Sequence, residues 1–205
     1  MMLKSLFFTF IVKPLIILIT GISIKNPQNL PENGQFIIIA NHNSHLDIMA
    51  IMSLFESKMI KKIRPVAASD YFFKNRILKW ISLHLIDIIP LDRSMQRSKQ
   101  THPLQNVYDA LDKGDSVIIF PEGSRGDPER LGQFKNGIGH LAKKYPNIGI
   151  ISIVLEETGK CLPKNEALLV PFIIKAEIKE PMKFGDHSLN IHEFVSKLEE
   201  NFTKG

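Results

Sequence analysis

Short apolar runs alternate with longer segments of helical periodicity along most of the chain, and this alternation constrains the fold more than any other feature. Runs such as FIIIA at 36–40 and SVIIF at 116–120 are typical of buried strands. The expected strands cover residues 36–40, 64–68, 86–91, 116–120, 148–155 and 168–178. The expected helices cover residues 48–55, 72–85, 98–113, 134–144 and 191–202. Alternating strands and helices predict an α/β fold with a mixed central sheet flanked by helices.

The first apolar segment stands apart from this alternation. Residues 3–24 are almost continuously apolar, but Lys13 and Pro14 interrupt them near the middle. A membrane-spanning helix needs about 20 apolar residues without a charge, and a proline inside a helix bends it. We therefore expect residues 1–24 to form a bent helix lying in one leaflet of a membrane, and residues 25–205 to form a single α/β domain. The alternative is an ordinary helix packed on the core.

Composition limits the classes of partner. The chain has 205 residues, 44% of them hydrophobic, which suits one domain with a buried core. Its net charge of +5 favours anionic partners: a membrane surface, phosphate groups or an acidic carrier protein. No zinc-ligand spacing, homeodomain pattern or RNP-like motif accompanies that charge, so a nucleic-acid partner is not expected. Cys161 is the single cysteine, which excludes an internal disulfide and suits a reducing compartment.

A polar motif, NHNSHLD at 41–47, directly follows the strand at 36–40. His42 is a natural general base, and a turn can bring the Asp47 carboxylate onto its far ring nitrogen, with a substrate hydroxyl replacing a protein nucleophile. Two alternatives stay open. One is a polar loop in which Asp47 caps the next helix, and the other is a metal site formed by His42, His45 and Asp47. No further cluster with ligand spacing supports the metal, so none is expected.

The strand at 116–120 runs directly into a second motif, PEGSRG at 121–126. Its glycines let backbone N–H groups approach an anion, and the Arg125 guanidinium can bind phosphate through two parallel hydrogen bonds. Ser124 can add a hydroxyl donor, and Glu122 can orient Arg125 or hold a substrate hydroxyl. The alternative is a surface turn with an incidental salt bridge.

A third motif, IIPLDR at 88–93, ends a strand with a basic residue. This residue, Arg93, is well placed to meet an anionic ligand at the carboxyl edge of a sheet. The alternative is a solvated arginine paired with Asp92. The basic run KKIR at 61–64 likewise suits either a solvated loop or contact with lipid headgroups or phosphates.

In this order, the three motifs resemble those of the glycerolipid acyltransferase family, which includes the 1-acyl-glycerol-3-phosphate acyltransferases. The family pattern N-H-x-S-x-x-D matches residues 41–47, and F-P-E-G-T/S-R matches residues 120–125. The basic residue that ends the family's second motif matches Arg93, and the stretch FKNG at 134–137 is also similar.

The resemblance covers about residues 30–180, most of the chain. It has one departure at Ser152, which stands where the family usually has a proline. That region of the family is associated with the acyl-donor side, so the departure bears on donor preference and not on the His/Asp chemistry.

The resemblance implies an acyltransferase that moves a fatty acyl group from acyl-CoA or acyl carrier protein to the hydroxyl of lysophosphatidic acid or a similar lysophospholipid. The thioester is a co-substrate, and no cofactor is implied. His42 would remove the hydroxyl proton, Asp47 would orient His42, and backbone N–H groups near the motif loops would stabilise the oxyanion. The implied substrate-binding residues are Arg93, Glu122, Gly123, Ser124 and Arg125.

These partners place the expected enzyme on a membrane, at its cytoplasmic face and in contact with lipids. A lyso-aminolipid acceptor is an alternative. A non-catalytic lipid-binding protein is another, although binding alone needs neither His42 nor Asp47. A thioesterase that uses water as the acceptor is disfavoured, because the chain has no G-x-S-x-G sequence.

Overall fold

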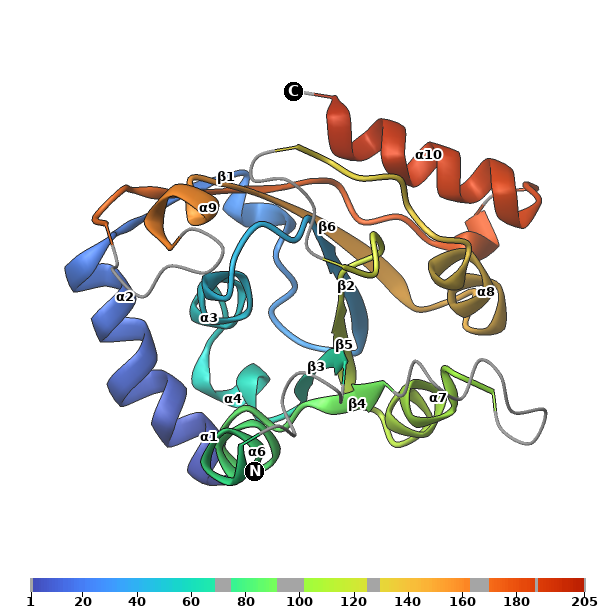
Figure 1. Ribbon diagram of the computed structural model, residues 1–205. Coiled ribbons are helices and arrows are strands. Elements are labelled where there is room, and N and C mark those ends of the chain that lie inside the picture. Colours follow the sequence, from blue (N-terminus) through green and yellow to red (C-terminus); the bar gives the residue numbers. More distant parts are fainter. Residues whose placement is uncertain are drawn as a thin grey trace.

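The computed structural model describes residues 2–68, 75–91, 102–124, 130–162, 170–186 and 188–204. Within these residues, seven strands form one mixed sheet in the order β1-β7-β6-β2-β5-β3-β4, with helices on both faces (Figure 1). The strands are β1 Ile22–Lys25, β2 Phe36–Ala40, β3 Ile63–Ala68, β4 Ile89–Leu91, β5 Ser116–Ile119, β6 Gly149–Glu156 and β7 Ile174–Ile178. The predicted α/β fold with a mixed sheet is confirmed.

Five neighbouring strands of this sheet run parallel. β2 pairs with β5 on one side and with β6 on the other, and β3 and β4 continue the parallel order beyond β5. β7 pairs antiparallel with β6, and β1 runs parallel to β7, which makes the sheet mixed. The carboxyl ends of the five parallel strands therefore meet at one edge, where open α/β sheets bind their ligands.

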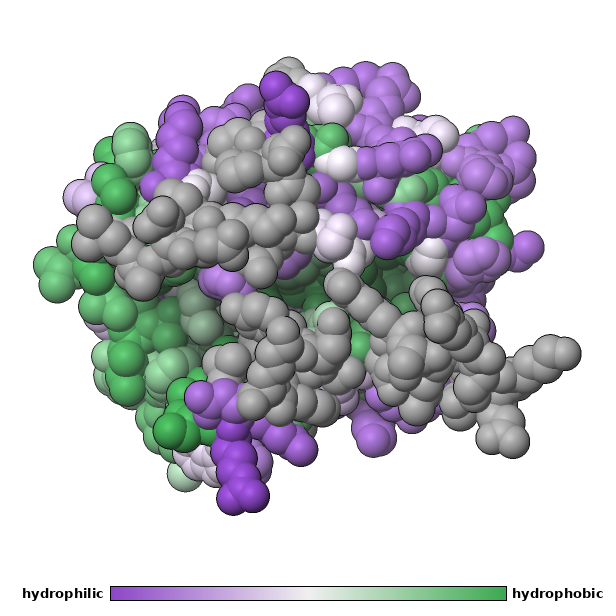
Figure 2. All heavy atoms as spheres, viewed as in Figure 1, coloured by the Kyte–Doolittle hydropathy of each residue, from purple (hydrophilic) through white to green (hydrophobic). Residues whose placement is uncertain are grey.

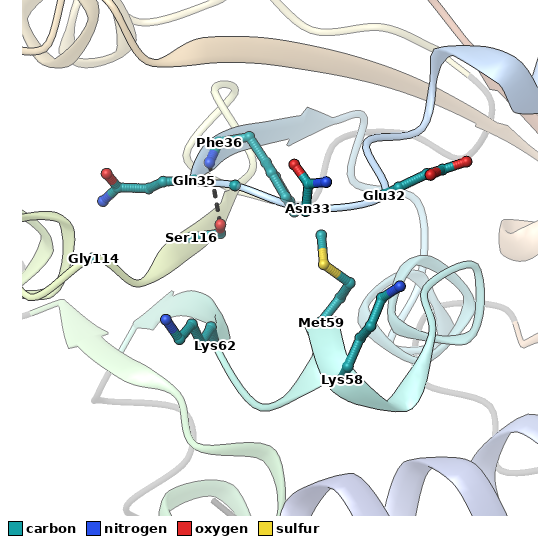
Figure 3. A pocket seen from close by; sticks show the side chains of 10 residues that line it. Glu32, Asn33, Gln35, Phe36, Lys58, Met59, Lys62, Gly114 and Ser116 are labelled. Carbon is teal, nitrogen blue, oxygen red and sulfur yellow. Dashed lines mark hydrogen bonds between the residues drawn. The ribbon is translucent and has the colours of Figure 1, made fainter.

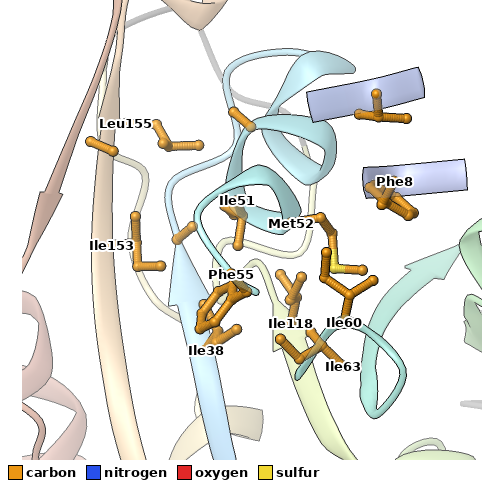
Figure 4. Packing of buried hydrophobic residues seen from close by; sticks show 14 of the residues in the cluster. Phe8, Ile38, Ile51, Met52, Phe55, Ile60, Ile63, Ile118, Ile153 and Leu155 are labelled. Carbon is orange, nitrogen blue, oxygen red and sulfur yellow. The ribbon is translucent and has the colours of Figure 1, made fainter. Parts of the chain in front are cut away.

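Helices cover both faces of the sheet. They are α1 Met2–Phe7, η1 Phe8–Val12, α2 Lys13–Ile19, η2 Pro27–Asn29, α3 Leu46–Ser53, α4 Ser57–Ile60, α6 Arg76–Ile81, η3 Ser82–Ile86, α7 Gln105–Asp112, α8 Gly137–Lys144, α9 Thr158–Cys161, η5 Phe184–Asp186 and α10 Ile191–Thr203. Because side chains alternate along a strand, Ile38 faces the layer with α2 and α3, whereas Ile37 and Ile39 face the layer with α7, α8 and α10. Figure 4 shows the first cluster, which joins Phe8 to Met52 of α3.

The predicted strand at 86–91 is wrong at its start. Residues 82–86 form the π-helical turn η3, and the strand begins only at Ile89. Asp87 lies between them with a left-handed backbone (φ 61°), a conformation that interrupts an extended run.

Three other predicted elements begin later than expected. The strand predicted at 168–178 begins at Ile174, the helix predicted at 98–113 begins at Gln105, and the helix predicted at 134–144 begins at Gly137. A residue that precedes a proline disfavours the helical conformation, so Pro103 favours a helix that starts after it. The predicted positions that lie outside the described residues are 72–74, 98–101 and 168–169.

The predicted end of the N-terminal helix at residue 24 is wrong. The helix ends at Ile19, and Gly21 turns the chain with a φ of 71°. Residues Ile22–Lys25 then join the sheet as β1, with Ile22 in register with Ile174 of β7. This strand depends on a partner far along the chain, so local apolar character gave no sign of it.

A π-helical turn, η1, lies directly before Pro14 in the N-terminal helix. Lys13 donates its backbone N–H to the Phe8 carbonyl, five residues back. Pro14 has no N–H to donate and would clash with an ordinary helical turn before it. The wider turn relieves this conflict, as π-bulges do in other interrupted helices.

One stripe of the N-terminal segment is buried, and the opposite face is exposed. Phe8, Val12 and Ile16 lie at four-residue spacing and belong to the core cluster that includes α3 and α4. Phe10 and Leu18 are 70% and 84% exposed, and Figure 2 shows apolar surface on this side of the molecule. In the part of the chain that the structure describes, Met2–Ile19 is the one helix long and apolar enough to cross a membrane, with a mean hydropathy of 2.0.

Candidate active site

Two of the sequence motifs meet at the carboxyl edge of the sheet. β2 ends at Ala40 and β5 ends at Ile119, and these neighbouring parallel strands are in register at Ile39 and Ile119. The NHNSHLD motif follows β2 and the PEGSRG motif follows β5. The two loops therefore leave the sheet from adjacent strand ends, although 80 residues separate His42 from Glu122 in the sequence.

The predicted pairing of His42 with Asp47 is present in the structure. Nδ1 of His42 lies 2.9 Å from Oδ2 of Asp47. The Asp47 side chain is fully buried, whereas that of His42 is 20% exposed. An ionised carboxylate can only accept, so this contact places the ring proton of neutral His42 on Nδ1 and leaves Nε2 as the basic nitrogen.

Asp47 is held by more than the histidine. Its Oδ2 also accepts hydrogen bonds from the backbone N–H groups of Asn43 (2.7 Å) and Ser44 (2.8 Å). The N-cap of α3 is His45, whose side chain makes no cap bond, and Asp47 lies inside the first turn. Asp47 therefore holds the loop around His42 in place through three hydrogen bonds. The alternative in which Asp47 only caps the helix does not account for its contact with the His42 ring.

Glu122 connects the two motif loops. Its Oε1 accepts a hydrogen bond from the backbone N–H of His42 (2.9 Å), and its Oε2 accepts one from the backbone N–H of Gly132 (2.8 Å). The side chain is 7% exposed. In this structure Glu122 shapes the site by fixing the backbone of His42, and direct contact between Glu122 and a substrate stays a prediction.

Gly132 is a residue of the site that the sequence motifs did not reveal. A Cβ atom at this position would lie 2.6 Å from Oε2 of Glu122. Only glycine lets the 130–134 segment approach the carboxylate closely enough to donate its N–H group. A glycine in a stretch of unassigned loop was the sole signal in the sequence.

Side-chain amides anchor the His42 loop to β6. Asn41 donates to the carbonyl of Leu155 (2.7 Å) and accepts from its N–H (2.8 Å), and Asn43 donates to the same carbonyl (3.1 Å). The Ser44 hydroxyl donates to the carbonyl of Leu162 (2.9 Å), just after α9. The polar residues of the motif thus hold the histidine in place from a third strand.

The ring of Phe120 stacks on the ring of His42. The two ring centroids are 4.1 Å apart, with an interplanar angle of 16°. Phe120 is the first residue after β5, so its position depends on the pairing of β5 with β2. The stack and the Asp47 contact together fix the plane and the direction of the imidazole.

The other predicted substrate-binding residues are only partly described. Gly123 has a left-handed backbone (φ 76°), and its N–H donates to the Phe120 carbonyl (3.0 Å), which closes the turn after β5. Ser124 is exposed beside it. Arg93 and Arg125 lie outside the described residues, so their binding of a phosphate stays a prediction.

The structure also bears on the metal alternative and on the single cysteine. Among the described residues, no group of three or more His, Cys, Asp and Glu side chains is arranged to hold a metal ion. Cys161 is fully buried in the short helix α9, and its thiol donates to the Phe172 carbonyl (3.1 Å). A buried, hydrogen-bonded thiol is typical of a structural cysteine.

The hollow shown in Figure 3 lies at the other edge of the sheet. Its volume is about 560 Å³, and Phe36 and Ser116, which begin β2 and β5, line it together with Lys58 and Lys62. His42 follows the opposite end of β2. The hollow is therefore separate from the histidine site.

Ser152 lies in the interior of β6, in register with Ile39 of β2. Its side chain is 1% exposed, and its hydroxyl has no hydrogen-bond partner within the described ranges. By strand alternation it points to the same side as Ile150, into the layer with α8 and α10.

The fold and the site define an α/β protein with a histidine–aspartate pair at the carboxyl edge of its sheet. A family model described as Acyltransferase matches residues 21–156. That match covers more than half of the chain and includes both motif loops. The chain belongs to the acyltransferase family.

Individual relatives agree with this assignment. The chloroplastic 1-acyl-sn-glycerol-3-phosphate acyltransferase LPAT1 of Arabidopsis thaliana is 32% identical over 183 residues, which are 88% of this chain and 49% of that protein. Its counterpart BAT2 of Brassica napus is 31% identical over 181 residues, 87% of this chain and 50% of that protein. The chain spans about half the length of these curated relatives.

A solved structure shares the fold. The crystal structure of the 1-acyl-sn-glycerophosphate acyltransferase PlsC from Thermotoga maritima matches with a TM-score of 0.75 at 20% sequence identity. The match covers 99% of this chain and 80% of that one. The arrangement of strands and helices described above is therefore that of a known structure.

Proposed function

We propose that this chain transfers a fatty acyl group from a thioester donor, acyl-CoA or acyl carrier protein, to the free hydroxyl of lysophosphatidic acid. The observation that carries the proposal is the 2.9 Å contact between His42 and Asp47, which leaves Nε2 directed away from the carboxylate and basic. The names of the relatives support the choice of acceptor, since both are 1-acyl-sn-glycerol-3-phosphate acyltransferases.

In the proposed reaction, Nε2 of His42 takes the proton of the acceptor hydroxyl as its oxygen attacks the thioester carbonyl carbon. The Asp47 carboxylate stabilises the imidazolium that forms. The tetrahedral intermediate then expels the sulfur, and the imidazolium returns its proton to the leaving thiolate. The products are the ester and the free thiol, so the protein needs no nucleophile of its own.

Binding of the substrates is proposed from the motif match. Arg93 and Arg125 bind the acceptor phosphate, and the turn from Glu122 to Ser124 shapes the site around it. Backbone N–H groups of the motif loops stabilise the oxyanion. A headgroup held in this way places its hydroxyl near the base, which lowers the entropy cost of the reaction.

The proposal includes a position on the membrane, at its cytoplasmic face. The exposed apolar side of Met2–Ile19 is the surface that would enter the lipid. The buried stripe of the same segment runs from Lys4 to Ile16 along the domain, which favours a helix lying in one leaflet over a helix that leaves the domain to span the bilayer. Acceptor and product are lipids, so an enzyme that is bound to the leaflet can bind them without first extracting them from the membrane into water.

The proposed function is tested by measuring thiol release from purified protein in phospholipid vesicles. Palmitoyl-CoA and palmitoyl-acyl carrier protein are supplied separately, each with and without lysophosphatidic acid. We expect release that depends on the acceptor, with one of the two donors preferred.

The other outcomes of this assay are also informative. Thiol release that is equal with and without acceptor would indicate a thioesterase. Release with a lyso-aminolipid and not with lysophosphatidic acid would replace the proposed acceptor. No release across a panel of lyso-lipids with either donor would refute the enzymatic proposal.

A further inference from the structure

Lys135 lies beside the PEGSRG loop at the active-site edge. Its backbone N–H donates to the carbonyl of Pro121 (2.9 Å), and α8 begins two residues later at Gly137. This bond fixes the start of the Lys135 side chain next to the loop that carries Glu122. Lys135 belongs to the FKNG stretch at 134–137, and only the fold shows that it lies beside the PEGSRG loop.

The Lys135 side chain passes directly across Gly123. A Cβ atom at Gly123 would lie 2.6 Å from Nζ, 3.0 Å from Cε and 3.1 Å from Cδ of Lys135. Gly123 also has a left-handed backbone, with a φ of 76°. The absence of a side chain at Gly123 is therefore what allows the ammonium group to lie over this turn.

The ammonium group of Lys135 forms no ion pair with Glu122 in the described part of the chain. Both oxygens of Glu122 accept hydrogen bonds from backbone N–H groups, those of His42 and Gly132. Within the described ranges, no hydrogen bond or ion pair joins Nζ of Lys135 to another group, and the residue is exposed. An ammonium group in this state offers a full positive charge and three donors to a ligand.

We infer that Lys135 binds the phosphate group of the acceptor. This inference rests on the proposed function and adds a binding residue to it. In lysophosphatidic acid the glycerol backbone separates the reacting hydroxyl from the phosphomonoester by a few bonds only. Glu122 accepts the backbone N–H of His42, and Lys135 lies over Gly123, the next residue, so the ammonium group lies at the edge of the sheet that carries the His42 loop.

The test is a comparison of steady-state kinetics for three variants. Lys135→Met removes the charge and keeps the length, and Lys135→Arg keeps the charge. Lys143→Met removes an exposed charge from the last turn of α8 and is the matched control. We expect Lys135→Met to raise the KM for lysophosphatidic acid by roughly ten- to a hundredfold and to change kcat little. The reason is that hydrogen bonds to charged groups are stronger than those between neutral groups. Lys135→Arg and Lys143→Met should stay within a few-fold of the original protein.

Three results would overturn the inference. The first is an unchanged KM for lysophosphatidic acid in Lys135→Met. The second is a rise confined to the KM for acyl-CoA, which would assign the ammonium group to the phosphates of the donor. The third is an equal effect of Lys143→Met, which would indicate attraction by overall charge.

A binding measurement separates this inference from the proposed reaction. Calorimetry with soluble 1-hexanoyl-glycerol 3-phosphate uses His42→Ala, which cannot turn over, with and without Lys135→Met. Weaker binding of the double variant supports the role of Lys135 even if no donor gives turnover and the proposed function fails. Equal binding, or no binding by His42→Ala itself, overturns the inference even if acyl transfer is observed.

Discussion

Asp47 concentrates three hydrogen bonds on one carboxylate oxygen. Oδ2 accepts from the His42 ring and from the N–H groups of Asn43 and Ser44, while Oδ1 is buried without a partner among the described residues. The two backbone bonds restrict the rotation of the carboxylate, so its direction is set before a substrate binds. The histidine is therefore oriented by a group that is itself held rigidly.

Replacement of His42 or Asp47 should remove activity and preserve the fold. His42→Ala loses the base and should lower kcat by roughly 10²–10⁴-fold. Asp47→Asn can keep an oxygen at the Oδ2 position, but it loses the charge that stabilises the imidazolium, and we expect a loss of similar size. The measurement is acceptor-dependent thiol release, with circular dichroism as the control for folding. Full activity in either variant would contradict the proposed mechanism.

Gly132→Ala should damage the site through Glu122. The added Cβ would lie 2.6 Å from the carboxylate, so the loop must shift, at a cost of about 1–3 kcal/mol typical of overpacking. We expect a lower midpoint of thermal unfolding and a lower kcat. Gly149→Ala is the matched control, because a Cβ at Gly149 would meet nothing within 4 Å. Equal effects of the two substitutions would show that the contact with Glu122 is not the cause.

At the scale of elements, a partly buried ion-pair network joins the N-terminal helix to the sheet. Lys4 of α1 is 1% exposed and lies 3.2 Å from Oδ2 of Asp87. The other oxygen of Asp87 pairs with Arg64 of β3 at 3.1 Å, and Arg64 also lies 3.6 Å from Asp115. The arginine of the basic run KKIR is thus a strand residue with two carboxylate partners, and neither the solvated-loop nor the headgroup interpretation describes it.

This network predicts different effects for the two partners of its Lys4–Asp87 pair. Asp87→Asn leaves Lys4 buried without a counter-charge and should lower the free energy of unfolding by roughly 3 kcal/mol, while asparagine still tolerates the left-handed backbone. Lys4→Met removes the buried charge and fills its space with apolar atoms, so we expect little change or a gain in stability. Chemical denaturation measures both.

The surface pair of Lys25 with Glu177 provides the comparison for this prediction. Its lysine is 62% exposed, so Lys25→Met should change the unfolding free energy by less than about 1 kcal/mol. If Asp87→Asn were as mild as Lys25→Met, the buried network would not fasten the helix.

At the scale of the whole molecule, the apolar surface lies to one side of the layered fold. The outer face of the N-terminal segment carries exposed large side chains, and the layer with α7, α8 and α10 across the sheet is largely polar outside (Figures 1 and 2). A large apolar face on a basic protein is typical of a surface that binds a membrane or another protein.

Phe10→Ser and Leu18→Ser should weaken membrane binding without unfolding the protein. These side chains are 70% and 84% exposed, so the folded state loses little packing. Each substitution should lower partition onto anionic vesicles by roughly tenfold, because it removes a large side chain from the lipid-facing surface. Vesicle sedimentation measures this, and His192→Ser on α10 is the control. Unchanged sedimentation of both variants would contradict the membrane proposal.

The sequence alone determined the alternation of strands and helices, the mixed α/β class and the pairing of His42 with Asp47. These features depend on residues that are close in the chain, because apolar periodicity is local and the histidine and aspartate are only five residues apart. Motif order was then sufficient to indicate the acyltransferase family.

The tertiary structure decided what holds the site together. Glu122 and Phe120 reach His42, and Leu155 receives Asn41, only because β5 and β6 flank β2 in the sheet. β1 is a similar case. Its residues were predicted to be part of the N-terminal helix, and their pairing with β7 shows that they form a strand. Such contacts join residues far apart in sequence. They depend on the order of the strands in the sheet, which local composition does not determine.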